Sequence, residues 1–170
     1  MSKRKDTKAL AQRNEETRHW ATVAGRQLAL DLYHGRETAS RPYGVGVVLD
    51  AGEKVWAEVP VRFNLDWVPP CKGGQDAQPA VRTWLVTSNR VVGRLDDDLL
   101  CGYRWEQAFG ARVDITTGSE VVKLDVEGEP TLMWSGPAVA PLAVAAVFRL
   151  YGLIGMIEHP GLAALRVGQG

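Results

Sequence analysis

The segment that decides the fold runs through residues 81–150. It contains VRTWLVT-SN-RVVGRL at 81–95 and VVKLDV-EGEP-TLMWS at 121–135, two pairs of strand-like runs separated by short turn signals. β-Branched and aromatic residues favour strands, whereas Ser, Asn, Gly and Pro favour turns. An apolar stretch rich in Ala, Leu and Val follows from Pro137 to about Tyr151, with its prolines near the start, where a helix tolerates them. This order predicts two hairpins followed by one helix.

A further strand pattern lies upstream, at residues 55–67, where every second residue is apolar. This alternation predicts a strand with one buried face. Trp56 falls on the opposite, polar face and is predicted to be exposed, and Trp67 lies at the end of the strand. Pro60 shares the polar face, which suits an edge strand or a bulge.

Shorter runs complete the layout. Strands are also expected at 43–49, at 99–106 and at 111–115, whereas three prolines and two glycines within 68–80 predict a loop. The result is a helix, about seven strands and a second helix, a mostly β arrangement of the α+β class.

The first part of the chain predicts an amphipathic helix from about residue 14 to residue 34. Trp20, Val23, Leu28 and Leu32 fall on one face at three- and four-residue steps. A helix of this length is marginal in water without a docking surface, so we expect it to pack on its own domain or on a second copy.

The distribution of charge also separates the N-terminal segment from the rest of the chain. Residues 1–41 carry nine Lys/Arg and five Asp/Glu, a net of +4, and the remaining residues carry the compensating −4. We therefore divide the chain into a basic N-terminal segment, 1–41, and a main domain, 42–170.

A family resemblance rests on the run WLVTSNRVV at 84–92, which resembles a hairpin of GRAM and pleckstrin-homology-like (PH-like) domains. The resemblance covers roughly residues 45–155 and extends to bacterial proteins of this type. A Gly-Glu turn at Gly52 precedes an early strand, Trp105 lies in a later strand, and Trp134 closes the last hairpin before the helix.

The fold implied by this resemblance is a bent, antiparallel, seven-stranded barrel capped at one end by the C-terminal helix. That helix would bury Leu142, Ala145, Ala146 and the stem of Arg149 in the barrel mouth. The role implied is binding of protein or lipid without catalysis. Lipid-binding members carry several Lys/Arg in an early loop, whereas the loop at 68–80 carries only Lys72.

We therefore expect a protein partner or a homo-oligomer, with peripheral binding to anionic lipid as the alternative. Exposed aromatic and apolar side chains mark partner surfaces. The candidate partner-binding residues are Trp20, Val23, Leu28 and Leu32 of the helix, together with Trp56 and Trp67, whereas Trp84, Trp105 and Trp134 are expected in the core.

Membrane insertion and nucleic-acid binding are both disfavoured. Residues 138–157 are long enough to span a bilayer, but Arg149 lies near their centre, where a charge costs about 2.5–3.5 kcal/mol on insertion scales. The same residues read better as a core helix. The arginines of the strands are interleaved with acids and form no basic stripe of the kind that binds nucleic acid.

No residue pattern indicates catalysis, a cofactor or a metal. Cys71 and Cys101 form neither a CxxC motif nor a Cys/His cluster, and the three histidines lack partners at ligand spacing. The charged start of the chain does not resemble a secretion signal, so we expect a cytoplasmic protein with free thiols.

Overall fold

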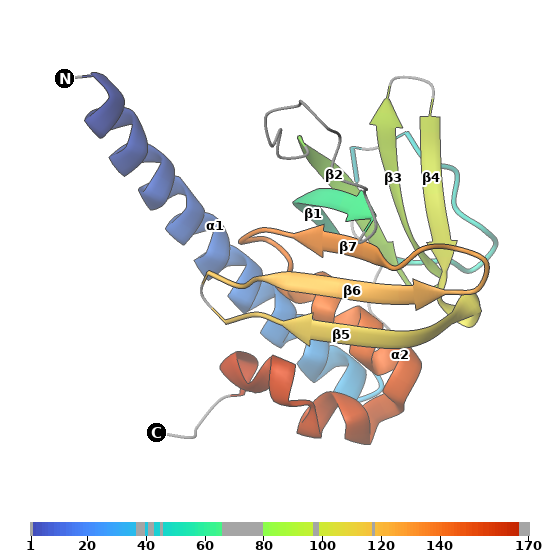
Figure 1. Cartoon of the computed structure of the whole chain (residues 1–170). Coiled ribbons are helices and arrows are strands. Elements are labelled where there is room, and N and C mark those ends of the chain that lie inside the picture. The colour runs from blue at the N-terminus through green and yellow to red at the C-terminus, as the bar shows by residue number, and fades with distance from the viewer. Residues whose placement is uncertain are drawn as a thin grey trace.

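The chain folds as a helix, a seven-stranded sheet and a second helix (Figure 1). The computed structural model describes residues 2–36, 40, 43–44, 46–65, 80–96, 99–116 and 118–166. The helices are α1 (Ser2–Tyr33) and α2 (Ala140–Glu158). The strands are β1 (Val55–Leu65), β2 (Val81–Thr87), β3 (Arg90–Asp96), β4 (Leu99–Arg104), β5 (Ala108–Asp114), β6 (Val121–Val126) and β7 (Leu132–Ser135). Two 3-10 helices, η1 (Trp105–Gln107) and η2 (Pro160–Leu165), follow β4 and α2.

All seven strands belong to one antiparallel sheet in the order β4-β3-β2-β1-β7-β6-β5. The two outermost strands, β4 and β5, are consecutive in the chain and are joined only by η1. The sheet therefore has to bend, and Figure 1 shows β3 and β4 crossing the direction of β5, β6 and β7. The bent seven-stranded sheet with a helix at each end of the chain confirms the expected fold class, although the sheet does not close into a ring.

Strand β1 joins the two parts of the sheet. It pairs with β2 along most of its length, and with β7 only from Arg62 onward. Pro60 lies opposite Thr83 of β2 and before the β7 pairing begins. Its missing N–H thus falls where β1 is paired on one side only, which explains how a central strand tolerates a proline.

The expected exposure of Trp56 is wrong. A bulge between Val55 and Ala57 places one extra residue in β1, which interrupts the strict alternation. Trp56 is only 7% exposed and its ring lies edge-to-face with Phe148 of α2 at 6.3 Å. Val55, on the other side of the bulge, packs instead with Val47, Leu85 and Val92 on the outer face of the sheet.

The main core lies between the bent sheet and the first half of α2. Every residue from Ala140 to Val147 is buried. Leu142, Ala145 and Ala146 are among them, as expected, whereas Arg149 is exposed. Trp84, Trp105 and Trp134 are buried, which confirms their expected place in the core.

Helix α1 is longer than predicted, and it packs through a face that only partly matches the predicted one: Leu28 is buried and Leu32 half-buried, as expected. It begins at Ser2 rather than near residue 14, and its second half lies against α2. Ala21, Gly25 and Leu28 are buried, and a Cβ on Gly25 would lie 3.3 Å from Ala140, so the glycine lets the two helices approach closely. Trp20 and Val23, expected on the docked face, are 47% and 52% exposed.

Residues 46–53 lie along the outer face of the sheet and form no strand, so the strand expected at 43–49 is absent from its described residues. Arginines of β3 and β4 hold this segment: Arg90 donates to the carbonyl of Val48 at 2.8 Å, and Arg104 pairs with Asp50 at 2.6 Å. These arginines therefore serve the fold.

Two predicted element ends also differ. The strand expected at 99–106 ends at Arg104, because Trp105 begins η1 and its indole donates to the carbonyl of Thr87 at 2.9 Å. Near the expected helix end at Tyr151, Gly152 adopts the non-helical φ of 71° and interrupts α2, and a second helical segment then follows as far as Glu158.

The end of the first half of α2 and the 3-10 helix η2 cover the β5 edge of the sheet. The hydroxyl of Tyr151 accepts from the N–H of Ala111 at 2.9 Å and donates to its carbonyl at 3.0 Å. Gly161 of η2 packs so closely on the carbonyl of Val113 that a Cβ at that position would collide with it. The side chain of Tyr151 and the backbone at Gly161 thus occupy the positions that a further strand would need in order to pair with β5.

Candidate groove between the two helices

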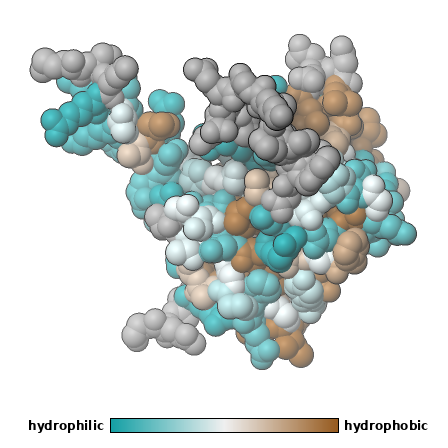
Figure 2. Space-filling model, in the orientation of Figure 1, coloured by the Kyte–Doolittle hydropathy of each residue, from teal (hydrophilic) through white to brown (hydrophobic). Residues whose placement is uncertain are grey.

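The kink at Gly152 divides α2 into a buried half and an exposed half. Beyond the kink, Leu153, Ile154 and Ile157 are 37%, 70% and 46% exposed. In Figure 2, apolar side chains gather at the lower end of the molecule, over the part that Figure 1 assigns to α2. Apolar side chains clustered in this way are characteristic of interaction surfaces.

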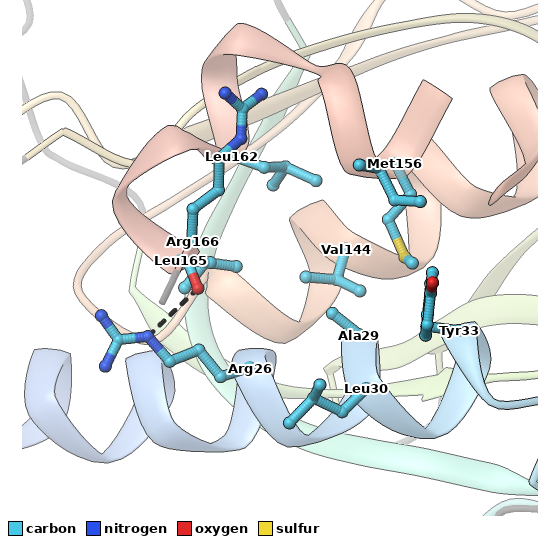
Figure 3. A pocket seen from close by; sticks show the side chains of 10 residues that line it. Arg26, Ala29, Leu30, Tyr33, Val144, Met156, Leu162, Leu165 and Arg166 are labelled. Atoms are coloured by element: carbon cyan, nitrogen blue, oxygen red, sulfur yellow. Dashed lines mark hydrogen bonds between the residues drawn. The ribbon is translucent and has the colours of Figure 1, made fainter. Parts of the chain in front are cut away.

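Beside this exposed tip lies a pocket of about 310 Å³, which we call the α1–α2 groove (Figure 3). Helix α1 contributes one wall and the end of α2 with η2 contributes the other. The lining residues are Arg26, Ala29, Leu30, Tyr33, Val144, Met156, Ile157, Leu162, Leu165 and Arg166. Leu30, Tyr33 and Ile157 are 46%, 52% and 46% exposed, so the groove is open to solvent.

Two guanidinium groups flank this apolar surface. Arg26 donates to the carbonyls of Leu165 and Ala164, both at 3.2 Å, and so joins α1 to the end of η2. Arg166 donates to the carbonyl of His159 at 3.2 Å. Burial together with the positive charge of Arg166 lowers the pKa of His159. Within the described part of the chain, neither arginine forms an ion pair with a carboxylate.

The residues that the sequence nominated are not brought together in this groove. Leu28 is buried between the helices and Leu32 is half-buried, whereas Trp20 and Val23 face solvent. Trp56 lies in the core, and Trp67 lies outside the described residues.

Trp20 belongs to a second depression, which is wider and shallower. It measures about 540 Å³ and lies between α1 and the start of the sheet, where Arg13, Glu16 and Glu58 place mixed charges beside Trp20 and Pro60. Its charged lining makes it less suited to an apolar partner than the α1–α2 groove.

The groove residues follow a pattern that the sequence contains. Arg26, Ala29, Leu30 and Tyr33 recur at three- and four-residue steps and so share one face of α1. That face lies next to the one that docks. Sequence alone does not reveal which of two adjacent apolar stripes meets the fold and which remains open.

The described residues also bear on metal binding and on membrane insertion. No group of three or more His, Cys, Asp and Glu side chains lies close enough to hold a metal ion among them. Helix α2 is long and apolar enough to cross a membrane by length and composition, and half of its apolar window is buried inside the fold.

Comparisons with known proteins give a likeness among solved structures. No family model and no curated protein matches the chain. Among solved structures, the chain is similar to the N-terminal PH domain of Vps36, with 12% identical residues and a TM-score of 0.49, over 69% of this chain and 94% of that domain. The surface of the present chain, rather than this likeness, carries the functional proposal.

Proposed function

We propose that the chain is a non-catalytic binding module whose α1–α2 groove takes an amphipathic helix of a partner protein. The carrying observation is an open apolar groove that continues into the exposed tip of α2. Two arginines flank it, and neither forms an ion pair with a carboxylate of the described residues. An apolar helix face enters such a groove through side chains spaced three and four residues apart. Acidic residues beside that face would pair with Arg26 and Arg166.

Shape and charge favour a protein over the membrane surface. A flat bilayer cannot fill a concave groove, whereas a helix can. The basic residues that would attract anionic lipid, Arg4, Lys5 and Lys8, lie at the projecting end of α1. At 1.5 Å per residue this end lies about 33–44 Å along the helix from Leu30 and Tyr33, so these basic residues are far from the groove.

The test uses a labelled model peptide with leucines at helical spacing and glutamates beside them, followed by fluorescence anisotropy. Ile157→Glu should weaken binding about tenfold or more, because a buried isoleucine contributes roughly 1.5–3 kcal/mol. The matched control is Val81→Glu, since Val81 is 53% exposed but belongs to β2, outside both the groove and the tip of α2. A peptide with lysines in place of the glutamates should bind more weakly.

Three results would contradict the proposal: absence of peptide binding, equal weakening by the two substitutions, and tighter binding of the lysine peptide. Binding to lipid is tested separately, with phosphatidylcholine vesicles that contain or lack phosphatidylserine. Binding to the anionic vesicles without binding to the peptide would favour the membrane alternative.

A further inference from the structure

The two edges of the sheet differ: among the residues that the structure describes, backbone hydrogen bonding is blocked at β5 but not at β4. At β5, Tyr151 and Gly161 occupy the backbone. At β4, the N–H of Trp105, which follows the strand, donates to the carbonyl of Asn89 at 3.1 Å. In an antiparallel strand pair, successive residues direct their N–H and C=O groups alternately toward the neighbouring strand and away from it. Arg104, Gly102 and Leu100 therefore direct their N–H and C=O groups away from β3.

Those outward groups have no backbone partner within the part of the chain that the structure describes. Strand β4 reads LLCGYR and lacks the lysine, proline and acidic residues that usually protect an edge strand. Leu99 and Leu100 are 52% and 44% exposed, and Gly102 is exposed as well. Figure 2 shows apolar side chains gathered at the β3–β4 end of the molecule.

We propose that β4 pairs antiparallel with β4 of a second copy, so that two chains form one continuous sheet about a two-fold axis. In such a pair, the residues whose backbone groups point away from β3 must lie opposite each other in the two copies of β4. The register with the greatest overlap then places Gly102 opposite Gly102 of the second copy. Leu100 then lies opposite Arg104 of the other chain. The three outward residues of each strand supply about six N–H···O=C bonds in total.

The side chains of β4 suit this pairing. Gly102 places no side chain at the axis, and Arg104 pairs with Asp50 of its own chain at 2.6 Å. The stem of Arg104 would cover Leu100 across the axis. A strand of this length makes a small interface, so the dimer should dissociate on dilution. This surface is separate from the α1–α2 groove.

The register predicts that two charged substitutions at Leu100 differ in their effect on dimer stability. Leu100→Lys places a positive charge opposite Arg104 of the other chain, twice per dimer, and should weaken the dimer about tenfold or more. Leu100→Glu places a negative charge there and should leave the dissociation constant within about threefold of the original. Sedimentation velocity of the full chain over a range of concentrations measures both.

Phe109→Lys is the control, because it changes a 73% exposed residue on the covered edge, and it should leave the dimer unchanged. Hydrogen exchange at the amides of Leu100, Gly102 and Arg104 should slow as the concentration rises. The proposal is overturned by a chain that stays monomeric at every concentration, by equal weakening with Lys and Glu, or by edge amides already protected in the dilute monomer.

Discussion

At the scale of single residues, Glu53 links the outer segment to the sheet. Its side chain is fully buried and accepts hydrogen bonds from Arg90 at 2.9 and 3.1 Å and from the hydroxyl of Thr87 at 2.6 Å. Burial alone would raise the pKa of Glu53, but the hydrogen bonds from Arg90 and Thr87 outweigh it, and the pKa is lowered below its usual 4.5. The ionised form is therefore the one that the fold stabilises.

This network predicts an acid-dependent loss of stability. A carboxyl with a lowered pKa stabilises the fold above its unfolded pKa, and this contribution disappears as the pH falls below about 4.5 and through the lower folded value. Glu53→Gln should cost about 2–3 kcal/mol at neutral pH and flatten the acid limb of stability against pH. Urea unfolding between pH 3 and about pH 7 measures this. The exposed Glu127→Gln is the control, and an unchanged acid limb in Glu53→Gln would contradict the assignment.

At the scale of elements, α2 has two different tasks in one helix. Its first half fills the core and ends at Tyr151, which bonds to the edge of β5, whereas its second half, redirected at Gly152, lines the groove. The sequence shows this division only as two glycines in an apolar run.

Two side chains in the first half of α2 should respond differently to truncation. Leu142→Ala should cost about 2–5 kcal/mol, because Leu142 is fully buried and the vacated space cannot collapse. Phe148→Ala should cost less, since Phe148 lies at the boundary, is only partly buried and meets Trp56 edge-to-face. Chemical denaturation of both variants gives the comparison. Equal midpoints for Leu142→Ala and the unmodified chain would mean that the first half of α2 is not core.

The two parts of helix α1 should contribute differently to the stability of the fold. Residues 4–16 are exposed throughout, whereas residues 18–32 hold the ion pair Arg18–Glu120 and the buried side chains of Ala21 and Leu28. Deleting residues 1–14 should change the free energy of unfolding by less than about 1 kcal/mol, because surface residues contribute little.

Deleting residues 1–35 should instead lower stability by several times that amount and expose the α2 surface that the helix covers. Thermal unfolding followed by circular dichroism, with light scattering for aggregation, separates the two deletions. A longer deletion that is as stable and soluble as the full chain would show that α1 is an appendage.

At the scale of the whole molecule, local patterns predicted the elements better than the surfaces. The hairpins at 81–95 and 121–135 and the alternation after Val55 are local signals, and the structure contains all of them. The single extra residue at Trp56 moved that side chain to the core, because a bulge depends on pairing with a neighbouring strand. The groove joins residues 26–33 to residues 144–166, and such a junction follows from tertiary packing that no local pattern contains.

The covering of β5 by Tyr151 has a consequence for assembly. In the language of polymer chemistry, a molecule with two open sheet edges is bifunctional and can grow into a fibre without limit. With one edge blocked, the molecule is monofunctional: coupling through β4 consumes its single reactive end, and growth terminates at two chains. A chain of this kind keeps an unprotected strand and still avoids indefinite aggregation, for as long as the Tyr151 hydroxyl holds the backbone of Ala111.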